Sequence, residues 1–181
     1  EITSPQSFSL TNSDFDDVED VLRKSGYGEK SGIKMFGHYE VIKKKPVMLE
    51  DKGVRFDLFL KEVICFWISE GMLERVREVH EFKNFIVKVV SPEDIILLKC
   101  ATERKRDRDD AKEIIEKMGV KWDVIINEAV NQTKEKGAIF SVFLYDFLEE
   151  LKEDLKVDVP REVIKKIRDI GEKEMVKRLK K

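Results

Sequence analysis

Residues with the types and spacing needed for chemistry lie in two stretches of this 181-residue chain. In the first stretch, Asp57 stands at the centre of the strand-like run 54–60. Aspartate is uncommon there because its short side chain competes with the hydrogen bonds of a sheet. A carboxylate on a rigid strand is a suitable ligand for a hard divalent cation. The alternative is a half-exposed strand face on which Arg55 and Lys61 are the partners of Asp57.

The second stretch begins with Lys99, which lies in an apolar run between Leu98 and Cys100. A lysine at this position can bind a phosphate group through its charge. In the alternative interpretation, Lys99 lies at the polar edge of an amphipathic helix and extends its ammonium group into water. Lys99 considered alone favours this alternative.

Arg106, Asp107 and Asp110 follow Lys99 in the pattern R-D-x-x-D. The guanidinium group of Arg106 suits a bidentate contact with a phosphate or a carboxylate. The pattern also predicts that Asp107 is the N-cap of a helix and that Asp110 occupies its third position. This capping role leaves room for a second role of Arg106.

Two helices are expected to position these residues. Ser91 is a suitable N-cap, Pro92 suits the first helical position, and Asp94 stands where a capping-box acid would. This pattern predicts a helix from Pro92 to about residue 104, and a second helix from about Asp107 to Gly119. Further helices are predicted near 122–137, over 138–155 and from Pro160 onward.

The part before residue 91 has a different pattern. A helix is expected to begin at Ser13 and a short helix to cover 69–79, whereas Asp51-Lys52-Gly53 is typical of a hairpin turn. Strands are predicted over 33–41, 47–49, 54–60 and 85–90, the last of them buried. The sequence therefore predicts an α+β fold, with a mixed α/β core over residues 1–90 and a helical region over 91–181.

The composition limits the classes of function. Charged residues make up 40% of the chain, with both Lys and Glu abundant, as is typical of proteins from hot environments. The net charge of −2 argues against binding of nucleic acid through bulk electrostatics, although a local basic patch is compatible with it. The isolated Cys65 and Cys100 fit reduced thiols better than a zinc site. No apolar run approaches the ~20 residues that span a bilayer, so we expect a cytoplasmic protein without a membrane partner.

Taken together, the motifs resemble nucleotidyltransferase-like proteins related to the AbiEii toxin type. More narrowly, they resemble uncharacterised archaeal families of that superfamily. The resemblance rests on R-F-D-L-F around Asp57, V-V-S-P-E-D-I-I-L-L-K ending at Lys99, and R-D-x-x-D-A beginning at Arg106. It covers roughly residues 13–119.

The resemblance implies a small mixed sheet flanked by helices, and transfer of a nucleotidyl group from a nucleoside triphosphate to an RNA or protein acceptor. Magnesium or manganese ions would assist the displacement. Asp57 and Lys99 would be catalytic residues, with Asp57 as a metal-binding carboxylate. Lys99 and Arg106 would hold the phosphates, and Asp107 and Asp110 would orient them. A partner protein, as in toxin–antitoxin pairs, or a homodimer is also implied.

The sequence departs from the family pattern before Ser13. A glycine-serine helix start and a D-x-D strand are expected there, but residues 1–12 contain no aspartate. Either that part precedes Glu1, or this member is degenerate. The alternative to an enzyme is therefore a degenerate relative that binds a nucleotide or a protein. A third alternative is a structural interaction protein built on the helices after Ser91.

Overall fold

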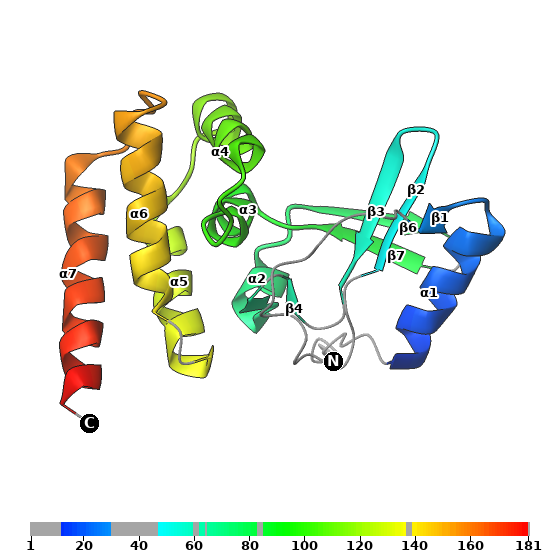
Figure 1. Ribbon diagram of the computed structural model, residues 1–181, viewed down its shortest axis with the longest axis horizontal. Coiled ribbons are helices and arrows are strands. Elements are labelled where there is room, and N and C mark those ends of the chain that lie inside the picture. The colour runs from blue at the N-terminus through cyan, green and yellow to red at the C-terminus, as the bar shows by residue number, and fades with distance from the viewer. Residues whose placement is uncertain are drawn as a thin grey trace, which may run out of the picture. The chain divides into compact units, whose positions relative to one another are not determined.

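The computed structural model describes residues 12–29, 47–59, 62–63, 65–82, 85–136 and 139–180. They form helices and small antiparallel sheets, which confirms the expected α+β class (Figure 1). By packing, the chain divides into two compact units, Glu1–Val63 and Ile64–Lys181. The predicted division into domains 1–90 and 91–181 follows the change to helical structure and stays a prediction.

The first unit contains helix α1 (Asn12–Lys24) and a three-stranded sheet. Strands β1 (Gly28–Glu29), β2 (Val47–Asp51) and β3 (Val54–Leu58) pair in the order β1-β2-β3, and both pairings are antiparallel. Strand β4 (Glu62–Val63) follows them in the sequence. The strand predicted over 33–41 lies outside the described residues.

The hairpin turn between β2 and β3 lies where it was predicted. Lys52 and Gly53 have φ angles of 48° and 82°, and two successive positive values are typical of a tight type I′ hairpin. The turn fixes the register in which Met48 lies opposite Asp57. Phe56 on β3 is 38% exposed although its ring packs edge-on against Tyr27, so this apolar strand is less buried than its sequence suggests.

The second unit begins with short elements. Strand β5 (Phe66–Trp67) precedes helix α2 (Glu70–Glu74), and β6 (Glu78–Phe82) pairs antiparallel with β7 (Phe85–Val89). The predicted helix over 69–79 is therefore too long, because its last two residues belong to β6. Strand β7 was also expected to be buried, but Ile86 is 50% exposed because this ribbon has only two strands.

Every element described after residue 91 is a helix, as predicted. These helices are α3 (Pro92–Lys99), α4 (Lys105–Met118), α5 (Trp122–Lys136), α6 (Phe140–Glu153) and α7 (Arg161–Leu179). Helix α6 packs against both α5 and α7 (Figure 1). Buried apolar side chains from α3 to α7 form one core together with Phe66 and Met72.

The boundary between α3 and α4 differs from the prediction. Helix α3 ends at Lys99, and α4 begins at Lys105 with Arg104 as its N-cap. Asp107 therefore lies inside the first turn of α4 and is not the cap. The reason is tertiary, since the carboxylate of Asp107 binds Lys99 and Thr102 instead of the first N–H groups of the helix.

Candidate functional site

The ammonium group of Lys99 lies between two carboxylates of the next helix. Its Nζ donates to Asp107 Oδ1 and to Asp110 Oδ2, each at 2.7 Å. Lys99 is the last residue of α3, and the short linker after it lets the first turns of α4 reach back to it. Thr102 of this linker donates its hydroxyl to Asp107 Oδ2 at 2.6 Å. We call these four residues the Lys99 cluster.

The charges of the Lys99 cluster are mutually stabilised. Burial by itself lowers the pKa of Lys99, but hydrogen bonds with Asp107 and Asp110 outweigh it and raise that pKa. Burial by itself raises the pKa of Asp107, but hydrogen bonds from Lys99 and Thr102 outweigh it and lower that pKa. Lys99 is therefore a cation and Asp107 an anion at neutral pH.

Arg106 lies at the exposed side of the Lys99 cluster. Its side chain is 90% exposed, and its Nε lies 4.0 Å from Asp110 Oδ2. The structure therefore brings together four of the predicted site residues. Lys99 is largely buried and fixed, whereas the guanidinium group of Arg106 extends into solvent and can reach an anion there.

Asp57 lies in the other unit, on β3. Both of its carboxylate oxygens accept hydrogen bonds from Arg55, from Nε at 2.5 Å and from Nη2 at 2.7 Å. This contact is the half-exposed pair that the sequence offered as the alternative interpretation. Lys61, the other partner considered there, lies outside the described residues.

The residues around Asp57 do not fit a divalent metal site as they stand. Magnesium is usually bound by one or two carboxylates that have oxygens available for the ion. Both oxygens of Asp57 are occupied by Arg55, and the described residues contain no group of three or more His, Cys, Asp or Glu that could hold a metal ion. The predicted metal role of Asp57 stays a prediction.

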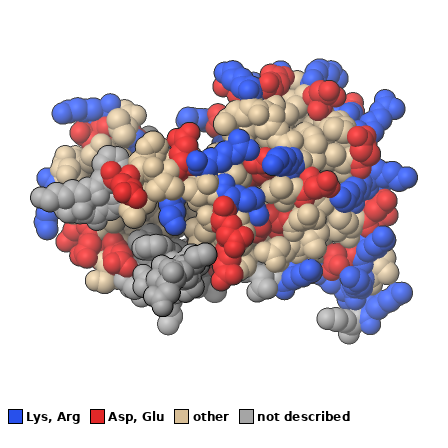
Figure 2. Space-filling view, turned by 180° about the vertical axis from the view of Figure 1, so that it is seen from behind, with Lys and Arg blue, Asp and Glu red and all other residues tan. Residues whose placement is uncertain are grey.

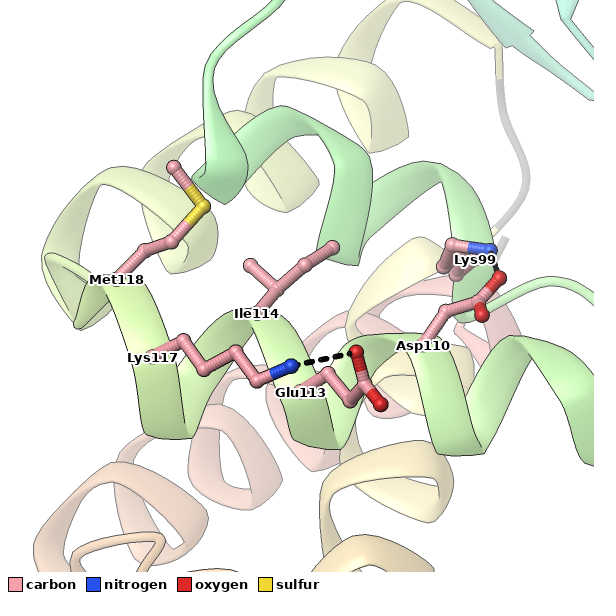
Figure 3. A pocket seen from close by; sticks show the side chains of 6 residues that line it. All are labelled: Lys99, Asp110, Glu113, Ile114, Lys117 and Met118. Carbon is pink, nitrogen blue, oxygen red and sulfur yellow. Dashed lines mark hydrogen bonds and ion pairs between the residues drawn. The ribbon is translucent and has the colours of Figure 1, made fainter.

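A groove runs along α4 beside the Lys99 cluster. It has a volume of about 340 Å³ and is lined by Lys99, Asp110, Glu113, Ile114, Lys117 and Met118. Lys99 and Asp110 lie at one end, Met118 lies at the other, and Ile114 lies between them (Figure 3). Lys117 donates to Glu113 at 3.1 Å along the rim. We call this feature the α4 groove.

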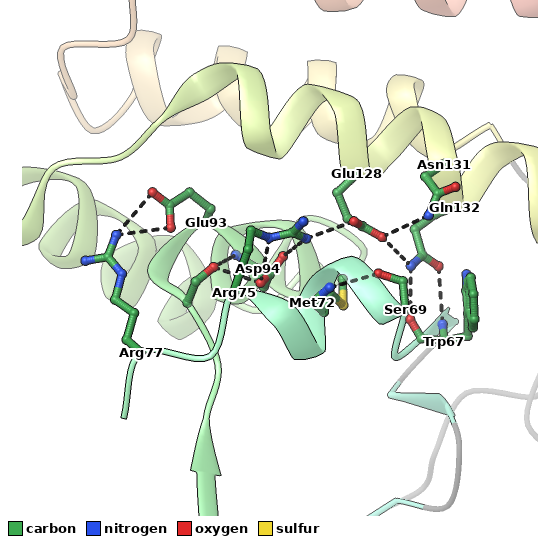
Figure 4. Close-up of polar contacts among 11 residues, drawn as sticks. Trp67, Ser69, Met72, Arg75, Arg77, Glu93, Asp94, Glu128, Asn131 and Gln132 are labelled. Atoms are coloured by element: carbon green, nitrogen blue, oxygen red, sulfur yellow. Dashed lines mark hydrogen bonds and ion pairs between the residues drawn. The ribbon is translucent and has the colours of Figure 1, made fainter. Parts of the chain in front are cut away.

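A second set of polar residues is largely buried and was missed by the sequence analysis. Arg75, just after α2, donates through Nη2 to Asp94 Oδ1 at 2.6 Å and to Glu128 Oε2 at 2.8 Å (Figure 4). Asp94 is 1% exposed and Glu128 is 5% exposed, so Arg75 compensates two buried charges. We call these three residues the Arg75 network.

Further polar contacts of buried or capping side chains hold the start of α3 in place. Ser91 caps the helix as predicted, since its Oγ accepts from the backbone N–H of Asp94 at 3.2 Å. Buried Glu93 accepts from the backbone N–H of Lys121 at 3.1 Å and lies 3.4 Å from Arg77 Nη2. The S-P-E-D stretch therefore fixes the helix that ends at Lys99. Two acids at the start of an apolar helix were the signal that could have indicated buried partners.

The surface of the protein carries both signs of charge. On the face that Figure 2 shows, basic and acidic side chains are interspersed, as the net charge of −2 suggests. Among the described helices, none combines the length and the apolar character needed to cross a membrane.

A comparison with protein families gives a match over most of the chain. The matching family is described as nucleotidyl transferase of unknown function (DUF2204), and its model covers residues 16–181. The chain belongs to this family. No curated protein and no solved structure matches the chain.

Membership in this nucleotidyl transferase family bears out the broader part of the predicted resemblance. The matched range includes Asp57, the Lys99 cluster and the Arg75 network. It supports a nucleoside triphosphate as the substrate. The relation to the AbiEii toxin type and an archaeal origin stay predictions.

Proposed function

We propose that this protein is a metal-dependent nucleotidyltransferase that transfers a nucleotidyl group from a nucleoside triphosphate to an RNA or protein acceptor. The observation that carries the proposal is the Lys99 cluster, which lies within the range of the family match. A lysine that is held in place and kept charged by two carboxylates is preorganised to stabilise charge on a phosphate group.

The roles of the cluster residues follow from its hydrogen bonds. An ammonium group has three N–H donors, and Asp107 and Asp110 each accept one from Lys99. In this proposal the third N–H donor of Lys99 contacts an oxygen of the triphosphate, while the two carboxylates orient the ammonium group. Arg106 supplies a second, exposed cation for the same triphosphate.

Asp57 is proposed as the metal-binding carboxylate, which requires its pair with Arg55 to open. A bound magnesium or manganese ion would supply charge stabilisation at the transferred group. A nucleoside triphosphate would bring further oxygen ligands of its own. An antitoxin-like partner protein or a homodimer belongs to the same proposal.

The pairing of Asp57 with Arg55 favours a second candidate function. A carboxylate engaged by arginine through both oxygens is what a degenerate relative would have if it binds nucleotides or proteins without catalysis. The two candidates differ in one measurable respect, because only the first predicts transfer of the label from a nucleotide.

The test uses the purified full chain with magnesium or manganese, each α-³²P-labelled nucleoside triphosphate in turn, and total RNA or protein as acceptor. We expect transfer by the wild type, and a loss of about 100-fold or more in Lys99→Met and Asp57→Asn, as for removal of a charge-stabilising group. Lys166→Met is the matched control, since Lys166 is half-exposed on α7 and pairs with Asp123.

Unchanged transfer in Asp57→Asn would remove the metal role from Asp57. Nucleotide binding without transfer under any of these conditions would favour the second candidate function.

A further inference from the structure

We propose that the α4 groove binds the nucleoside part of the nucleoside triphosphate, with the triphosphate extending to Lys99 and Arg106 at its end. This inference rests on the proposed function for the identity of the ligand. It adds an orientation for that ligand and a site for its base.

The charge of the α4 groove argues against phosphate along its length. Its charged lining consists of two cations, Lys99 and Lys117, and two anions, Asp110 and Glu113. Lys117 is paired with Glu113, and Lys99 with Asp110. Away from the Lys99 end, the paired Lys117 and Glu113 give no net attraction to a polyanion, but they offer donors and acceptors to the uncharged polar groups of a base and a sugar.

The apolar part of the lining suits the flat face of a base. Ile114 packs against the core and gives the groove a fixed floor, whereas Met118 is 59% exposed. A methionine thioether is polarisable and packs favourably on aromatic rings. Every nucleobase has such a face, and stacking on it is tolerant of base identity. Contact with a base would therefore remove the apolar surface of Met118 and Ile114 from water, which is favourable.

The dimensions of the groove agree with a ligand of two parts. From Asp110 to Met118, α4 advances by about 12 Å, given 1.5 Å per residue. The volume of about 340 Å³ lies at the lower end of the range for small-molecule sites, so it suits the nucleoside while the phosphates extend outside it.

Arg106 completes the arrangement at the phosphate end. It is not part of the groove lining, but it lies 4.0 Å from Asp110, which lines that end. Its side chain is 90% exposed, so it can meet phosphates that leave the groove there. The base and the triphosphate thus contact different residues, and the two contacts can be tested separately.

The experiment measures three probes: an unmodified nucleoside (adenosine, guanosine, cytidine and uridine in turn), the corresponding nucleoside triphosphate, and inorganic triphosphate. Binding is followed in the full chain by the NMR signals of ¹³C-labelled methionine methyl groups, with Met118→Ala identifying the signal of Met118. The internal control is Met175, which is 48% exposed on α7.

We expect at least one nucleoside to shift the Met118 signal and to leave that of Met175 unchanged. Met118→Ala should weaken binding of that nucleoside and its triphosphate by up to about tenfold, the upper range for a sulfur–aromatic contact, without affecting inorganic triphosphate. Arg106→Ala should weaken inorganic triphosphate and the nucleoside triphosphate but not the nucleoside.

The inference is overturned if no nucleoside shifts the Met118 signal at millimolar concentration, or if Met118→Ala weakens inorganic triphosphate as much as the nucleoside triphosphate. Failure of the proposed function has a different signature. Nucleoside binding at Met118 with no transfer activity would contradict the proposed enzymatic function but support the α4 groove as a nucleoside site. Transfer with wild-type kinetics in Met118→Ala would support the enzymatic function and contradict the α4 groove as the nucleoside site.

Discussion

Lys99 and Asp107 each favour the charged form of the other, and this mutual effect defines a pH window. The pKa of Asp107 is lowered by its partners, so its contribution to folding stability is present above the unfolded pKa of about 3.9 and is lost as the pH falls through the lower folded value. The pKa of Lys99 is raised, so its contribution is present below the unfolded pKa of about 10.4 and is lost as the pH rises through the higher folded value. The cluster is therefore intact throughout the neutral range.

Replacement of Asp107 by asparagine tests this window. We expect Asp107→Asn to lower the free energy of unfolding by about 1–2 kcal/mol at pH 7, because the acceptor of the Lys99 hydrogen bond loses its negative charge. The difference from the wild type should shrink on acidification below pH 4, where Asp107 itself becomes protonated. Urea unfolding at pH 7, 4 and 2.5 measures both effects.

The control for this experiment is Asp123→Asn. Asp123 is 77% exposed in its pair with Lys166, and an exposed pair contributes little. A loss in Asp107→Asn that is the same at all three pH values would contradict the assignment of the pH dependence to this carboxylate.

At the scale of secondary-structure elements, the Arg75 network joins the end of α2 to α3 and α5. One guanidinium group compensates two carboxylates that are almost fully buried. The fit is tight, since a Cβ atom added at Gly71 would lie 2.9 Å from Arg75 Nη1. The network therefore fixes the start of the helix that carries Lys99 at its other end.

Loss of Arg75 should be costly for this reason. We expect Arg75→Gln to destabilise the protein by about 3 kcal/mol, the lower end for breaking a buried ion pair, because Asp94 and Glu128 lose their counter-charge. Thermal and urea unfolding measure the change.

Adding Asp94→Asn to Arg75→Gln should recover part of the lost stability. Arg168→Gln is the control, as Arg168 is half-exposed and its ion pairs on α7 are 3.9 Å long. Equal losses in Arg75→Gln and Arg168→Gln would refute the role of the network.

At the scale of the whole molecule, the residues with proposed roles are divided between the two units. Asp57 belongs to the first unit, while the Lys99 cluster, the α4 groove and the Arg75 network belong to the second. Both tryptophans of the chain, Trp67 and Trp122, also belong to the second unit. Tryptophan fluorescence therefore reports on that unit.

A change in the hairpin turn separates the two units experimentally. Gly53→Val places a β-branched residue at a φ of 82°, which we expect to destabilise the β2–β3 hairpin by about 1–2 kcal/mol. Hydrogen exchange of β2 and β3 amides should accelerate, while the urea midpoint followed by tryptophan fluorescence stays unchanged. A shift of that midpoint by the full amount would show that the chain unfolds as one cooperative body.

Features set by neighbouring residues were predictable from the sequence. The Ser91 cap and the Lys52-Gly53 turn depend on residues at most three positions away, so their local patterns were sufficient. The Arg75 network depends on partners 19 and 53 residues apart, which become neighbours only when the helices pack. For Asp107 the local pattern predicts an N-cap, but in the structure its carboxylate instead binds Lys99 and Thr102.

At the proposed metal site, Arg55 would compete with the cation for the carboxylate oxygens of Asp57. Each side chain is about one-third exposed, and exposed pairs contribute about 0–1 kcal/mol, with a bidentate pair such as this one at the upper end of that range. With so small an energy, the carboxylate of Asp57 is unpaired in a sizeable fraction of the molecules at any moment. The apparent affinity for a cation is the intrinsic affinity multiplied by that unpaired fraction. Arg55 would therefore weaken cation binding by less than about tenfold. In the proposed arrangement an internal guanidinium group would raise the cation concentration needed to occupy Asp57, by no more than that factor.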